Sequence, residues 1–240
     1  MVSRVQDPPL AVTKTGFGNR AVVSWGVLAL LLPVLLFQGP ARAQDDRAVS
    51  LMEEAGVRYE AIEVFCAGFQ QIMEVPLLEE IYESSGTLCQ GQPDRFAMRW
   101  TDPEGDRVVA DGEFFWVYYP SVDPEQVLQF SMALRPGGLD FHREFLEAPG
   151  EKYELEYVGE EVLEGRTAHV ISAKPLLRSA FTEARLWLDV ERSVILRVRI
   201  GMENGSVRTV TLSDIQLDPP TDPDRFRFSV PQGAQVIRRD

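Results

Sequence analysis

Apolar and polar side chains alternate along much of the chain, and this period of two constrains the fold more than any other feature. Successive side chains of a strand point to opposite faces, so each alternating run predicts a strand with one apolar face. Five runs show the pattern: residues 65–75, 95–100, 128–134, 194–200 and 226–230. We therefore expect a mainly β protein with helices, an α+β fold dominated by long antiparallel strands.

Two dipeptides mark turns between neighbouring strands. Asp111-Gly112 and Asn204-Gly205 both stand between strand-like runs. Such dipeptides favour type I′ hairpin turns, in which both central residues take a positive φ. Hairpins join strands in chain order, which predicts a meander and not a βαβ sheet.

Helical spacing is confined to two segments. Residues 44–59 place Val49, Met52 and Val57 near one helix face. The segment Asp140 to Glu147 interrupts the β pattern and carries Phe141, Phe145 and Leu146 at spacings that a short helix favours. These two helices are expected to cover one face of the sheet.

Residues 114–119 carry aromatic side chains on both faces of the expected strand, so both faces must be covered. An ordinary core of sheet and helices satisfies this need, and so does a sheet curled around a cavity that holds a lipid tail. The pattern does not separate the two. If the cavity exists, adaptable apolar side chains should line it: Phe96, Met98, Trp100, Phe114, Trp116, Phe130, Met132, Phe141 and Phe145.

The first 43 residues have the features of a signal peptide. An apolar run from Ala21 to Phe37 follows mostly positive charges, and Ala41 and Ala43 form the small-residue pattern that precedes cleavage. We expect cleavage before Gln44; the alternative is an uncleaved membrane anchor, since the run is almost long enough to span a bilayer. Export to the periplasm follows from the first interpretation.

Residues 44–240 have the length of one domain. The whole chain has a formal net charge of −13, and the N-terminal segment carries more basic than acidic residues. Its removal leaves a still more acidic protein, which argues against binding nucleic acid or an anionic membrane surface by charge.

The chain has only two cysteines, Cys66 and Cys89. An even number in an exported protein usually means pairing. A hairpin turn centred between Leu77 and Leu78 places residue 66 directly opposite residue 89, within the distance that a disulfide bridges. We predict this disulfide; a bulge in the hairpin would shift the register and favour two buried free thiols.

Residues for catalysis or metal binding are sparse. The only histidines are His142 and His169, and there is no H-E-x-x-H, C-x-x-C, G-x-S-x-G or phosphate-binding glycine loop. Each histidine is interpreted as an ordinary surface or hydrogen-bonded residue. We predict no metal, no cofactor and no enzymatic activity.

Two motifs resemble a known family. The block Asp111-Gly112-x-x-x-Trp116-x-Tyr118-x-Pro120 and the ending Phe226-x-Phe228-x-x-Pro231-x-Gly233-x-x-Val236 are similar to those of the periplasmic outer-membrane lipoprotein carriers, the LolA-like family. The resemblance spans most of residues 45–240. It implies an incomplete antiparallel β-barrel with a helical lid and an apolar interior that holds acyl chains of lipoproteins.

One position departs from the family pattern. An Arg that usually precedes the Pro of the family's R-P-x-x-F motif contacts the lid, whereas this chain has Gln92 before Pro93. An amide does not make the charge-assisted bonds of a guanidinium, so the lid is expected to be held differently.

The resemblance implies a monomeric carrier that shuttles lipoproteins from the inner to the outer membrane. Its partners would be an inner-membrane ABC-type lipoprotein-releasing complex and an outer-membrane acceptor. The alternatives are a periplasmic lipid-sensing regulator with a carrier-like domain and, third, an enzyme.

Overall fold

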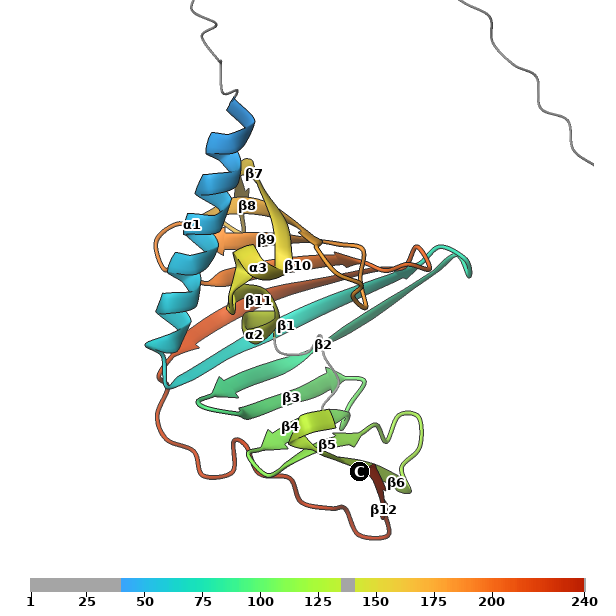
Figure 1. The fold of residues 1–240 in the computed structure, drawn as a ribbon. Coiled ribbons are helices and arrows are strands. Elements are labelled where there is room, and N and C mark those ends of the chain that lie inside the picture. The colour runs from blue at the N-terminus through green and yellow to red at the C-terminus, as the bar shows by residue number, and fades with distance from the viewer. Residues whose placement is uncertain (1–39, 135–140, 240) are drawn as a thin grey trace, which may run out of the picture. The chain divides into compact units, whose positions relative to one another are not determined.

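Twelve strands form one strongly curved sheet whose two end strands, β7 and β12, do not pair with each other (Figure 1). The computed structural model describes residues 40–134 and 141–239. The strands are β1 (Val64–Val75), β2 (Glu80–Gly91), β3 (Arg95–Asp102), β4 (Arg107–Asp111), β5 (Phe114–Tyr118), β6 (Gln126–Ser131), β7 (Tyr153–Leu163), β8 (Arg166–Pro175), β9 (Glu183–Asp189), β10 (Ile195–Gly201), β11 (Val207–Leu217) and β12 (Gln235–Arg239).

The strands pair mostly in chain order. β1 to β6 form one antiparallel run and β7 to β11 another, and the antiparallel pair β1–β11 joins the two. β12 adds to the outer edge of β6 in the parallel sense. The predicted curved antiparallel sheet, an incomplete barrel, is confirmed, and the meander is interrupted only at β1–β11 and β12.

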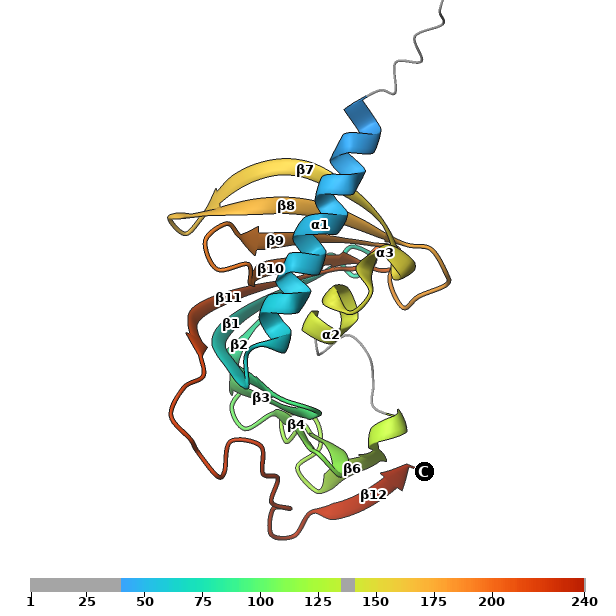
Figure 2. The same ribbon diagram turned by 60° about the vertical axis from the view of Figure 1, so that its left-hand side comes forward.

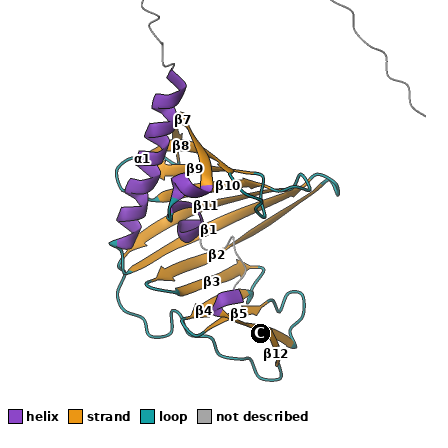
Figure 3. Cartoon of the chain, in the orientation of Figure 1, coloured by secondary structure: helices purple, strands orange, loops and turns teal. Residues whose placement is uncertain are grey.

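Helices lie on the concave side of the curl (Figures 2 and 3). They are α1 (Pro40–Glu60), α2 (Phe141–Leu146), α3 (Pro149–Lys152) and the 3₁₀ turn η1 (Met132–Leu134). Both predicted helices are confirmed. The buried stripe of α1 consists of Ala48, Met52, Ala55 and Tyr59, whereas Val57 is 68% exposed, so the expected apolar face was partly wrong.

Both predicted hairpins form, but their turns are not type I′. Gly112 and Gly205 have positive φ, while Asp111 and Asn204 do not. The Asp111 carboxylate accepts the backbone N–H groups of Glu113 and Phe114, and the Asn204 Oδ1 accepts that of Ser206. These side-chain bonds to the backbone stabilise turns of two kinds. Gly112 and Glu113 alone connect β4 to β5, one residue later than the dipeptide predicts, whereas residues 202–206 form a longer connection between β10 and β11.

Two predicted strands differ from the structure. β6 ends at Ser131 and continues as η1, so Met132 is not in a strand. Phe226 and Phe228 belong to an irregular segment that packs on the convex face, beside Ala97 and Val109. Their alternation reflects burial against the sheet and not strand pairing.

The predicted signal peptide lies outside the described residues, apart from residues 40–43, which begin α1. Within the described part of the chain, no helix has the length and apolarity needed to cross a membrane.

The predicted disulfide is confirmed. Cys66 lies opposite Cys89 in the β1–β2 ladder, and the register runs without a bulge from Val64–Gly91 to Val75–Glu80. The two Cα atoms are 4.1 Å apart. The bond lies on the convex face, where Cys89 packs beside Ala97 and Val109, and it joins the two strands at the centre of the sheet.

We expect reduction of this disulfide to lower the free energy of unfolding by about 3 kcal/mol, because the crosslink restricts the unfolded chain. Urea unfolding with and without a reductant measures the loss. The variant Cys66→Ala/Cys89→Ala should unfold identically in both conditions. Two reactive thiols in denatured, unreduced wild-type protein would contradict the pairing.

Candidate functional site

The concave face of the sheet is an apolar surface that α1 and α2 cover. Seven of the nine predicted lining residues belong to this interior. Phe96, Met98, Phe141 and Phe145 are buried in its core, and Trp100, Phe130 and Met132 are partly buried against it. The structure therefore brings together residues from β3, from β6 and the η1 turn that follows it, and from α2.

Phe114 and Trp116 lie on the opposite, convex face. Their neighbours Phe115 and Val117 point into the interior, and side chains alternate along β5. The Trp116 ring stacks on Phe228 at 5.0 Å between ring centroids, and its Nε1 donates to Asp111. Because both faces of this strand are aromatic, the sequence did not indicate which face was concave.

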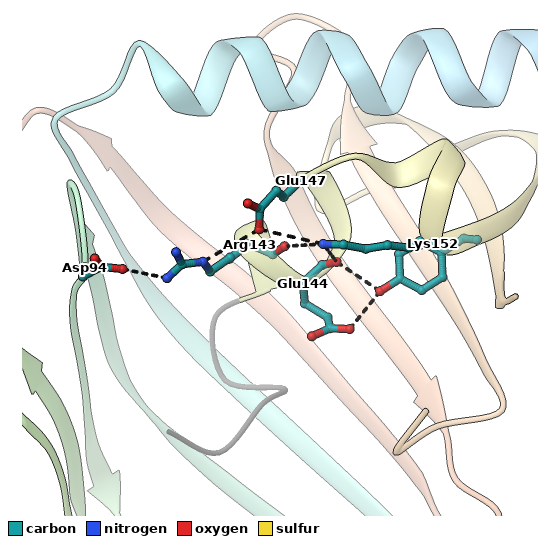
Figure 4. Close-up of polar contacts among 6 residues, drawn as sticks. Asp94, Arg143, Glu144, Glu147 and Lys152 are labelled. Atoms are coloured by element: carbon teal, nitrogen blue, oxygen red, sulfur yellow. Dashed lines mark hydrogen bonds and ion pairs between the residues drawn. The ribbon is translucent and has the colours of Figure 1, made fainter. Parts of the chain in front are cut away.

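The helix α2 is tied to the chain that follows it. Lys152 Nζ donates to the backbone carbonyls of Arg143 and Glu144, at 3.2 and 3.4 Å. The Tyr153 hydroxyl donates to the Glu144 carboxylate at 2.8 Å (Figure 4); burial and this carboxylate raise the pKa of Tyr153. These bonds satisfy carbonyls at the end of α2 and attach the helix to the start of β7.

On its other side, α2 contacts the turn between β2 and β3. Arg143 Nη1 donates to Asp94 Oδ1 at 2.7 Å, and both side chains are nearly half exposed. Arg143 also lies 3.8 Å from Glu147. We call the Asp94–Arg143 pair the latch, because it connects α2 to a strand pair distant in the sequence (Figure 4).

Gln92 lies in the same turn. Its backbone N–H donates to the Glu63 carbonyl at 3.0 Å, and its own carbonyl accepts from Arg95 at 3.1 Å. It lines the cavity at the end of α2. The contribution of its amide to lid closure stays a prediction, while the charged contact to the lid is made by Asp94, two residues later.

A cavity of about 230 Å³ opens between α1, α2 and the β2–β3 turn. Its walls include Tyr59, Ile62, Phe65 and Leu146, and its rim includes Asp94, Arg95, Arg143 and Glu147. Ligand pockets usually measure about 300 to 1,000 Å³. This pocket is smaller than that range, and we call the arrangement with α2 held to the β2–β3 turn by the latch the closed form.

The helices α1 and α2 approach each other closely at Gly56. A Cβ atom at this position would lie 2.8 Å from the Leu146 carbonyl oxygen, so only glycine permits this packing. At its N-terminal side, α1 is held by Arg47, whose guanidinium lies 3.9 Å from the Tyr157 ring centroid. Tyr59 accepts a hydrogen bond from Ile195 of β10.

The two histidines differ in their surroundings. His169 has the ordinary role that we expected, since its Nδ1 lies 3.3 Å from the Tyr157 hydroxyl and 3.4 Å from Glu160. His142 contradicts the expectation: it is buried, and within the described chain neither ring nitrogen has a hydrogen-bond partner. Burial lowers its pKa well below 6.5, so the ring is neutral at neutral pH.

Sequence reasoning also missed Arg208, which points to the concave side of β11 in line with Val210 and Leu212. Its Nε donates to Gln71 at 2.7 Å, and its guanidinium lies over the Phe141 ring. Burial lowers its pKa to about 10, so it stays charged at neutral pH. The sequence could have indicated this position, because Arg208 lies two and four residues before Val210 and Leu212 and therefore on the same face of the strand.

Asp94→Asn and Arg143→Gln should each accelerate hydrogen exchange of the α2 amides, by at most about fivefold, because half-exposed ion pairs contribute about 0 to 1 kcal/mol. The double variant should exchange no faster than either single variant, since both remove the same contact. Glu151→Gln, an exposed carboxylate on α3 outside these ion pairs, is the matched control. Additive effects of the two single variants would contradict a shared latch.

Comparisons with known proteins agree with this architecture. Residues 60–229 match the family described as outer membrane lipoprotein carrier protein LolA. The outer-membrane lipoprotein carrier protein of Halorhodospira halophila is 29% identical over 185 residues, which cover 76% of this chain and 83% of the relative. The outer-membrane lipoprotein carrier protein of Nitrosomonas europaea is 24% identical over 215 residues, which cover 88% of this chain and 98% of the relative.

Among solved structures, an uncharacterised conserved protein from Thermus thermophilus aligns with a TM-score of 0.52 at 18% identity. The alignment covers 81% of this chain and 98% of that protein, and it shows a shared fold. Together with the match over residues 60–229, these findings show that the chain belongs to the LolA family of outer membrane lipoprotein carrier proteins.

Proposed function

We propose that this protein binds the acyl chains of lipoproteins between the concave face of its sheet and the helices α1 and α2, and carries them from the inner to the outer membrane. One observation carries the proposal: a short helix, α2, covers an apolar interior and is held to the far strands by a half-exposed ion pair. Such a contact separates at little cost.

The arrangement of contacts favours a lid that turns about one side. The bonds from Lys152 and Tyr153 connect α2 to residues that follow it closely in the chain, so they can persist during opening. The Asp94–Arg143 latch joins distant segments and is the contact that breaks. Opening on this side exposes Phe141, Phe145 and Leu146, which cover the interior in the closed form.

Several further features belong to the proposal. Residues 1–43 act as a cleaved signal peptide that directs export to the periplasm, where proteins of this family work. An inner-membrane releasing complex and an outer-membrane acceptor load and unload the carrier, which acts as a monomer and catalyses no reaction. The carrier names of the relatives support this account. The lipid-sensing regulator remains the alternative, and a transfer assay distinguishes it.

Protein purified from its native compartment should release acyl lipids into an organic extract, and the loaded protein should pass lipoproteins to acceptor membranes. Mass spectrometry of the extract tests the first expectation, and a transfer assay tests the second. Bound lipid without transfer would favour the regulator. An extract free of acyl lipids, together with no binding of added lipoprotein, would contradict both functions.

A lipid with brominated acyl chains should quench the fluorescence of Trp100 but not of Trp116, since only Trp100 faces the interior. The variant Trp116→Phe should retain the quenching and Trp100→Phe should lose most of it. Trp187, in a separate cluster away from the interior, supplies a constant background in both variants. Quenching that disappears in Trp116→Phe would place the lipid on the convex face.

A further inference from the structure

His142 is held in an apolar stack within the lid helix α2. Its ring centroid lies 3.5 Å from that of Tyr59 on α1 and 4.8 Å from that of Phe65 on β1. The residue as a whole is 8% exposed. Nδ1 and Nε2 are both buried without a hydrogen-bond partner in the part of the chain that the structure describes.

Such a group is costly in a closed, ligand-free protein. A buried donor or acceptor without a partner costs about 1 to 3 kcal/mol, and buried polar atoms are nearly always paired. A phenylalanine ring would make similar stacking contacts to Tyr59 and Phe65 without this cost. The imidazole therefore needs a partner that the ligand-free closed form does not supply.

The position of His142 indicates where that partner comes from. His142 lines the 230 Å³ cavity, between apolar walls formed by Phe65, Ile62 and Leu146 and a polar rim that contains Asp94 and Arg143. A lipid has the same order of groups: a hydrocarbon chain, then an ester or amide carbonyl, then a polar part. His142 is a lining residue of the same cavity, together with these apolar and charged groups.

We propose that His142 forms a polar subsite of the acyl-binding interior, in which its ring N–H donates a hydrogen bond to the ester or amide carbonyl oxygen of a bound acyl chain. This inference rests on the proposed carrier function. A neutral imidazole has one donor and one acceptor nitrogen, so it suits a neutral carbonyl better than a phosphate, which binds cations more strongly. The ring thereby fixes how deeply the chain enters.

An ester lipid and an ether lipid of equal chain length differ in the carbonyl groups, so comparing their affinities measures what the carbonyl contributes to binding. The wild-type protein should bind dipalmitoylglycerol about three- to tenfold more tightly than the matched dihexadecyl ether, the range expected for one net hydrogen bond to a neutral group. His142→Phe should bind both lipids with the affinity that the wild type shows for the ether. His142→Asn, which keeps an N–H donor, should retain part of the preference for the ester. His169→Phe, the matched control, should retain the full preference.

The melting temperature of the ligand-free protein provides an independent measurement. His142→Phe should melt at or above the wild-type temperature, because the substitution removes two unpaired polar atoms from the core. This result also shows that the variant is folded when its lipid affinities are compared. A marked decrease would mean that the imidazole stabilises the closed form, which would overturn the inference.

The binding outcomes separate this inference from the carrier function. Equal affinity of the wild type for ester and ether overturns the subsite and leaves the carrier intact. Equal weakening of both lipids by His142→Phe does the same, because it indicates a structural role for the ring. Failure of the wild type to bind either lipid overturns the carrier proposal itself.

Discussion

Coverage of the concave apolar face is the constraint on which the rest of the structure depends. A single antiparallel sheet can leave one face in water, but here the inward face carries large apolar side chains such as Phe65, Phe69 and Met98. The strands β7 and β12 do not close the curl, so strand pairing cannot bury this face. The helices α1 and α2 must do so, and whatever displaces them must be equally apolar.

This exchange sets a requirement on the cargo. Phe141, Phe145 and Leu146 of α2 each contribute about 1.5 to 3 kcal/mol when buried, so lifting the helix costs roughly 5 to 9 kcal/mol. An acyl chain gains about 0.8 kcal/mol for each buried CH₂ group. Roughly six to eleven methylene groups therefore offset the opening. In the proposed carrier, a long acyl chain would therefore offset the cost of lifting α2.

The sequence predicted features that arise from local patterns. The β1–β2 register follows from one turn, and it placed Cys66 opposite Cys89 correctly. Features that depend on tertiary contacts were missed. The convex position of Trp116 depends on the direction of curvature, and the irregular path of Phe228 depends on packing against that tryptophan. His142 was missed for the same reason, since nothing in its neighbours along the chain shows that Tyr59 and Phe65 enclose it.

The latch lies in the same turn as Gln92, the position that departs from the family pattern. At the position of the family Arg this chain has the neutral Gln92, and the charged contact to α2 pairs Asp94, two residues later, with Arg143. Because both side chains are nearly half exposed, the pair contributes little to stability, and apolar burial beneath α2 holds the lid closed. In the proposed carrier, the ion pair fixes where α2 sits, and burial of an acyl chain would supply the free energy that moves the helix.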